Sequence, residues 1–142
     1  MGHFRFVDQG ALADAAIEVT GQDLDDLFAT AARALAVLMV DTRTLPLDVE
    51  RTVSLSASRE DLLLYDWLSE LILRKDRDQE VFPDVEVRVS GNGDVRLAAR
   101  LRGGSLASPR TARRRDPKAV TFHQFTLERG DRGWRASFVV DI

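Results

Sequence analysis

The chain has 142 residues, of which 44% are hydrophobic and 30% are charged, and its net charge is −3. This length and composition are typical of a single domain over residues 1–142, and they exclude global disorder. The absence of cysteine excludes disulfides, thiol nucleophiles and thiolate metal sites, so a bound metal would be held mainly by oxygen. The slight negative charge argues against a surface wholly adapted to nucleic acid.

The sequence also lacks the patterns of membrane insertion and secretion. No run of apolar residues approaches 18 in length, and no basic N-terminal region precedes a long apolar segment. We therefore expect a cytoplasmic protein that does not bind membranes.

The first half of the chain predicts three strands and two helices. Alternating apolar residues indicate strands around residues 4–6 and 15–19, joined through residues 8–10, and a third strand over 49–56. Helical spacing predicts an amphipathic helix over 23–40. A second helix follows, with Ser58 as its expected N-cap and a broad apolar face that includes Trp67.

The second half is predicted to form hairpins. Alternating residues on both sides of the turn at 90–94 indicate a β-hairpin over 82–101, and residues 103–117 form an irregular arm. The last two strands flank a turn at 129–133. The sequence thus predicts an α+β two-layer sandwich, in which a mixed sheet of about seven strands carries two main helices on one face.

Two carboxylates stand one residue apart at the end of the chain, on the Asp141 side chain and as the terminal carboxyl of Ile142. Hard divalent cations take oxygen ligands from such clusters, and one more carboxylate brought near by the fold would complete a site, with water filling the rest. The alternative interpretation is a solvated strand end.

A short stretch near residue 113 is strongly basic. Its residues are Arg110, Arg113, Arg114, Arg115 and Lys118. The stretch is either a solvated basic loop or a docking surface for phosphate or an acidic partner. Lys118, at the head of a predicted strand, is open to the same two interpretations.

Two further side chains are candidates with open roles. Asp41 follows the first predicted helix, where the negative helix terminus disfavours an acid, so it has either a functional role or a loop-capping role. Phe122 is expected to face the core, which would turn His123 outward as either a functional or an ordinary surface histidine.

Several segments together resemble the archease family, and the resemblance covers nearly the whole chain. They are residues 34–41 (Ala-Leu-Ala-Val-Leu-Met-Val-Asp), 63–68 (Leu-Leu-Tyr-Asp-Trp-Leu), 118–123 (Lys-Ala-Val-Thr-Phe-His), 133–136 (Gly-Trp-Arg-Ala) and the final Asp141-Ile142. The resemblance implies a non-enzymatic protein that assists the GTP-dependent RNA ligase acting on 3′-phosphate ends in tRNA splicing and RNA repair. It would promote guanylylation and turnover of the ligase and would meet RNA only through that partner.

The resemblance also implies a divalent metal site, with calcium as the expected ion. Its ligands would be Asp14, Asp141 and the terminal residue Ile142. Asp14 matches the aspartate of the family's His-Thr-Ala-Asp motif, whereas Ala11-Leu12 replaces its His-Thr part. The arm differs as well, because residues 103–107 lack the acids of the family's Gly-Glu-x-x-Asp pattern.

Two other functions compete with ligase activation. The first is a direct RNA-binding module that uses the basic arm over 110–118 for phosphate contacts. Single-strand readers interleave stacking aromatics with charge, and residues 103–117 contain none, which favours protein docking. The second is a metal-dependent hydrolase built on Asp14 and Asp141, for which the sequence supplies no evident base or nucleophile.

Overall fold

The computed structural model describes residues 2–7 and 14–142, which form seven strands and two helices. The predicted turn at 8–10 and the Ala11-Leu12 departure lie outside the described residues. In chain order the elements are β1 (His3–Val7), β2 (Asp14–Gly21), α1 (Leu24–Met39), β3 (Val49–Ala57), α2 (Glu60–Asp78), β4 (Glu80–Ser90), β5 (Val95–Ser105), β6 (Ala119–Gly130) and β7 (Gly133–Asp141).

The strands form two separate sheets, which confirms the α+β class but corrects the expected single mixed sheet. One sheet has the order β1-β2-β7-β6 and the other β3-β5-β4, and every pairing between neighbours is antiparallel. The chain passes from β2 through α1 into β3 of the second sheet. The connection through α1 therefore adds no strand parallel to β2 in the first sheet. Local alternation predicts a strand but does not identify its non-local partner.

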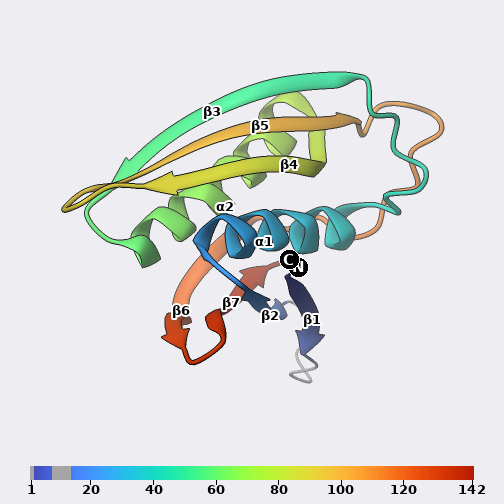
Figure 1. Cartoon of the computed structure of the whole chain (residues 1–142). Helices are drawn as coiled ribbons and strands as arrows, with labels where there is room; N and C mark the ends of the chain where they lie inside the picture. Colours follow the sequence, from blue (N-terminus) through green and yellow to red (C-terminus); the bar gives the residue numbers. More distant parts are fainter. Residues whose placement is uncertain (1, 8–13) are drawn as a thin grey trace.

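The two helices lie between the sheets rather than on one outer face of a single sheet (Figure 1). α1 contacts β2 of one sheet and β4 of the other, and α2 contacts both β6 and β3. Because both sheets turn an apolar face toward the helices, each keeps one face for solvent. The solvent faces are therefore where polar side chains can gather.

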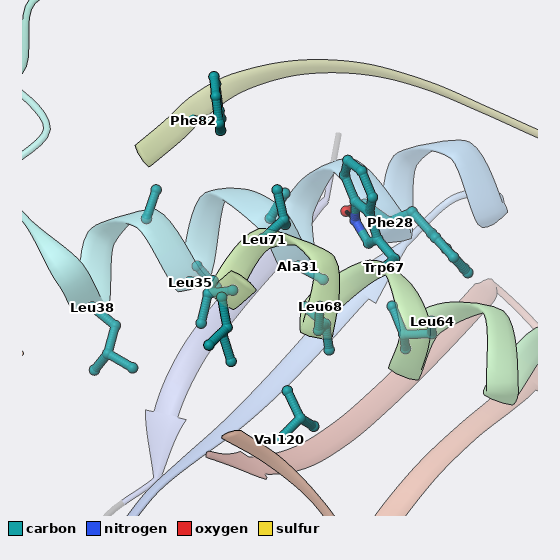
Figure 2. Close-up of a cluster of buried hydrophobic side chains, with 14 of the residues drawn as sticks. Phe28, Ala31, Leu35, Leu38, Leu64, Trp67, Leu68, Leu71, Phe82 and Val120 are labelled. Atoms are coloured by element: carbon teal, nitrogen blue, oxygen red, sulfur yellow. Dashed lines mark hydrogen bonds between the residues drawn. The ribbon is translucent and has the colours of Figure 1, made fainter. Parts of the chain in front are cut away.

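The apolar faces of the helices meet in one hydrophobic core (Figure 2). Trp67 is completely buried, and its indole Nε1 donates a hydrogen bond to the backbone oxygen of Phe28 at 3.0 Å, which joins α2 to α1. Burying the ring of this tryptophan removes a large apolar surface from water, while the hydrogen bond satisfies its only polar atom. The prediction that Trp67 belongs to the core is confirmed.

The start of each helix shows which side chains cap its backbone. The Asp23 side chain accepts a hydrogen bond from the backbone N–H of Asp26 and is the N-cap of α1. The N-cap of α2 is Arg59, which makes no capping hydrogen bond with its side chain, so the prediction of Ser58 was wrong by one residue. Glu60 and Asp61 still place negative charge in the first turn, where the helix dipole favours it.

Candidate carboxylate site

The register of β2 and β7 brings together the two aspartates that the sequence places far apart. Asp14 is directly opposite Asp141, and the neighbouring pair Ala15 and Val140 is buried. Directly opposite residues point to the same face of a sheet, with Cβ atoms about 5 Å apart. Because the Ala15 and Val140 side chains point to the core, both carboxylates lie on the solvent face of the four-stranded sheet.

A shallow depression on this face contains both carboxylates. It is lined by Asp14, Thr121, His123, Gln124, Val139 and Asp141. One of the candidate side chains from β6, His123, therefore joins the two aspartates. The polar neighbours Thr121 and Gln124 were not predicted as site residues, because isolated Thr and Gln give no distinguishing sequence signal.

A bulge in β6 produces this arrangement. The regular pairing with β7 stops at Thr121, opposite Val139, and resumes at Thr126, opposite Ser137. The segment 122–125 therefore faces a single residue of β7, and Gln124 adopts a left-handed backbone with φ of 58°. The backbone N–H of His123 donates to the hydroxyl oxygen of Thr121 at 3.0 Å. Such bulges redirect side chains and are frequent beside functional sites.

Phe122 faces α2, as strict alternation predicts, but it lies at the margin of the core on the edge strand β6 rather than inside the core. Its side chain is 51% exposed and stacks on the ring of Tyr65 in α2, with ring centroids 4.2 Å apart. Phe125 instead packs toward the buried Phe138. The Phe122 ring thus lies on the α2 side of the sheet, held in place by a stacking partner, and does not line the carboxylate depression.

The side-chain atoms that line the depression include the oxygen donors that hard cations prefer. Its side-chain oxygens come from Asp14, Asp141, Thr121 and Gln124. Over residues 2–7 and 14–142, however, no three side chains of His, Cys, Asp or Glu form a group able to hold a metal. The terminal carboxyl of Ile142 would be the third acidic donor, next to Asp141 in the chain. The side chain of Ile142 packs against the core.

Lys118 lies beside the carboxylate site but contributes to it through its backbone. Its N–H donates to the carbonyl oxygen of Asp141 at 2.7 Å, which holds the start of β6 against the end of β7. The side chain of Lys118 is exposed. Its position therefore permits the docking role that the sequence left open.

The backbone of the basic stretch is bonded to the end of α1, while its basic side chains are exposed. The backbone N–H groups of Arg114 and Arg115 donate to the carbonyls of Met39 and Leu38 at 2.8 and 3.0 Å. The Arg113 side chain donates to the carbonyl oxygen of Leu106. The last carbonyls of a helix have no hydrogen-bond donor within the helix. This distant segment supplies the donors for two of them in α1.

Asp41 is fixed by its neighbour Arg43. The Arg43 side chain donates to Oδ1 at 3.0 Å and to Oδ2 at 2.9 Å, and its backbone N–H donates to Oδ1 at 3.1 Å. The side-chain hydrogen bonds, followed by the backbone hydrogen bond, lower the pKa of Asp41 from 3.8 to about 2. These contacts order the loop after α1, as the loop-capping interpretation of Asp41 anticipated. Asp41 does not line the carboxylate depression.

Comparison with known proteins agrees with this architecture. Residues 4–142 match the model of the archease protein family. The chain is 38% identical to the archease of Archaeoglobus fulgidus over 98% of both sequences, and 35% identical to that of Methanopyrus kandleri over 92% of this chain and 94% of the relative.

Two solved structures share the fold. The solution structure of Methanobacterium thermoautotrophicum protein 1598 superimposes with a TM-score of 0.79 at 30% identity, covering 98% of both chains. An archease crystal structure from Thermotoga maritima gives a TM-score of 0.62 at 19% identity, covering 99% of this chain and 98% of that one. The family match, the identities over nearly full length and the shared architecture lead to one conclusion: the chain belongs to the archease family.

Proposed function

We propose that this protein activates a GTP-dependent RNA ligase that joins 3′-phosphate ends in tRNA splicing and RNA repair, by promoting ligase guanylylation and turnover. Family membership supports the proposal, and the observation that carries it is the pairing of Asp14 with Asp141 on an exposed sheet face beside the β6 bulge. The Thermotoga maritima relative is described as a possible chaperone, which agrees with action on another protein.

An activating role fits the form of the site. The depression is shallow and His123 in its lining is exposed, and Phe122, the residue before it on β6, is exposed on the α2 side, so a second protein can reach both. Exposed aromatic side chains surrounded by polar groups are common anchors of protein interfaces. Arg113, Arg114 and Arg115 would add charge that speeds association, an effect that salt screens. The protein would act by contact, without a reaction of its own.

A divalent cation, with calcium expected, would bind between Asp14, Asp141 and the carboxyl group of Ile142. It would supply positive charge and open coordination positions for oxygen groups of the ligase. The chain's own contribution is the register that holds the two carboxylates on one face, anchored by the Lys118 N–H to Asp141 carbonyl bond.

The test measures ligase turnover on a 3′-phosphate RNA with excess GTP, using a purified ligase from the same organism. Wild-type protein should accelerate turnover, and Asp141→Asn should remove most of the acceleration because the amide keeps the shape but loses the charge. Asp131→Asn is the matched control, since Asp131 is an exposed aspartate in the β6–β7 turn. Its turnover should equal that of wild type.

A calcium titration by calorimetry on the same variants separates the metal from the ligase role. Asp141→Asn, and a chain extended beyond Ile142, should bind calcium more weakly than wild type and Asp131→Asn. If the wild-type protein does not accelerate its cognate ligase, the proposed function is wrong. If it accelerates the ligase but binds no calcium, the activating role stands and the metal site is lost in this protein.

A further inference from the structure

The solvent face of the β3-β5-β4 sheet carries a patterned set of charges that the carboxylate site does not use. Both helices cover the opposite side of this sheet (Figure 1). The residues that point outward form four cross-strand rows: Glu50–Arg102–Asp84, Thr52–Arg100–Glu86, Ser54–Ala98–Arg88 and Ser56–Arg96–Ser90. All of these residues are exposed. The alternating neighbours Val53, Leu97 and Leu101 are buried, which fixes the orientation of the face.

The charges are unevenly distributed along this face. Arg102 stands between two acids, Glu50 and Asp84, at one end. Toward the other end, Arg88, Arg96 and Arg100 surround the small side chain of Ala98, with Glu86 as the one acid in their rows. We call these three arginines the arginine triangle. Hydroxyls of Thr52, Ser54, Ser56 and Ser90 surround it, and Asp94 lies in the turn beyond.

The arginine triangle has no partner within the described part of the chain. Over residues 2–7 and 14–142, Arg88, Arg96 and Arg100 form no ion pair and no side-chain hydrogen bond. By contrast, Arg51 is paired with Glu80 at 2.8 Å and Arg74 with Glu70 at 2.7 Å. Guanidinium groups left unpaired on a rigid sheet are available to bind an external anion.

The spacing of the arginines and the chemistry of their neighbours indicate which kind of anion this face would bind. Arg96 and Arg100 are four residues apart on β5, which is about 14 Å. A strand of double-stranded DNA carries a phosphate about every 3.4 Å of helix axis, and a strand of an RNA duplex is at least as dense in phosphate, so the triangle can reach several phosphates of one backbone. None of the outward residues is aromatic. Base stacking, the usual means of holding a single strand, is therefore absent from this face.

We infer that the solvent face of the β3-β5-β4 sheet binds the sugar-phosphate backbone of double-stranded RNA, with Arg88, Arg96 and Arg100 on the phosphates. Duplex RNA is recognised largely through its shape, its phosphates and its 2′-hydroxyls. The hydroxyls of Thr52, Ser54, Ser56 and Ser90 are of the kind that can bond to 2′-hydroxyl groups. Binding would be independent of sequence. This surface is distinct from the basic stretch over 110–118 and independent of the ligase role.

The experiment uses the full chain and a fluorescent RNA duplex of roughly 16 base pairs, with anisotropy measured at several salt concentrations. The triple variant Arg88→Gln, Arg96→Gln, Arg100→Gln should bind about tenfold or more weakly at low salt, with the slope of log affinity against log salt reduced by about 2–3. The matched control replaces Arg113, Arg114 and Arg115 by glutamine, which removes equal charge from the other basic surface. Its affinity should stay within about twofold of wild type.

A gain of binding provides the opposite test. Glu86 is directly opposite Arg100, so Glu86→Gln should strengthen duplex binding severalfold by removing the acid that faces Arg100 across the strands. The duplex should bind more tightly than the matching single strand. The inference is overturned if the wild type does not bind the duplex, if the control loses as much affinity as the triangle variant, or if the single strand binds equally well. None of these results bears on ligase activation, which is measured separately.

Discussion

Asp41 shows how the pKa of one ionisable side chain is set by its nearest hydrogen-bonding partner. Its pKa is lowered to about 2, first by the side-chain hydrogen bonds from Arg43. A carboxyl group whose pKa falls on folding stabilises the folded state above its unfolded pKa, here near 3.8. That contribution is lost as the pH falls from about 4 toward 2. The unusual acid at the helix end is therefore explained locally.

Arg43→Ala should raise the pKa of Asp41 toward 3.8, because the variant keeps the backbone hydrogen bond but loses the side-chain hydrogen bonds. Carboxyl-carbon NMR titration measures this value directly. Arg77→Ala is the control, since Arg77 forms the corresponding adjacent pair with Asp78 and should leave Asp41 unchanged. An Asp41 pKa that stays near 2 in Arg43→Ala would contradict the assignment.

At the scale of the secondary-structure elements, the C-terminal ends of the two helices are capped in different ways. α2 ends locally at Gln79, whose left-handed φ of 56° lets its N–H donate to the carbonyls of Arg74 and Lys75. α1 has no basic residue in its last turn and stops at the extended Val40. Its last carbonyls are bonded by the backbone of residues 114 and 115, far along the chain. Only the end of α2 can therefore be tuned by a local substitution.

Gln79→Gly should increase the free energy of unfolding by about 0.5–1 kcal/mol, because glycine adopts a positive φ without the strain that a Cβ creates. Urea denaturation of the two proteins measures the difference. Asp66→Gly is the matched control inside α2, at an exposed position, where the same new residue should instead lower stability by about 1 kcal/mol. A loss of stability in Gln79→Gly would show that the Gln79 side chain contributes more than its backbone strain costs.

At the scale of the whole molecule, the connection from β5 to β6 joins the two sheets and is held by a buried lysine. Lys75 of α2 is 5% exposed; its Nζ donates to the Pro117 carbonyl at 2.6 Å and pairs with Asp116 and Asp76. Arg114 and Arg115 of the same connection cap α1. This connection therefore packs on both helices just before the strand that carries His123.

Lys75→Met should lower the free energy of unfolding by about 2 kcal/mol, because the buried Pro117 carbonyl would lose its donor. Chemical denaturation measures this change. Lys118→Met, which alters an exposed lysine near the same connection, should change stability by less than about 0.5 kcal/mol. Equal effects of the two substitutions would show that burial of Lys75 contributes nothing.

The elements of the fold could be predicted because their signals are local. Alternation at period 2 identified β4 and β5 on either side of their turn, and helical spacing identified α1 and α2. The family resemblance, carried by short segments such as residues 133–136, was confirmed by the match over residues 4–142. Gly133 shows why such a segment is constrained, since its φ is 128° and an added Cβ would lie 2.3 Å from the Gly21 carbonyl oxygen.

By itself, the sequence determined the α+β class, the two helices, the turns and which acids were candidates for a site. The tertiary structure decided that the strands divide into two antiparallel sheets and that Asp14 stands opposite Asp141. It also decided that Phe122 stays exposed at the edge of the sheet and that Arg88 and Arg100 flank Ala98 on one face. Periodicity depends on neighbours along the chain, whereas register depends on how strands from distant segments bury their apolar faces together.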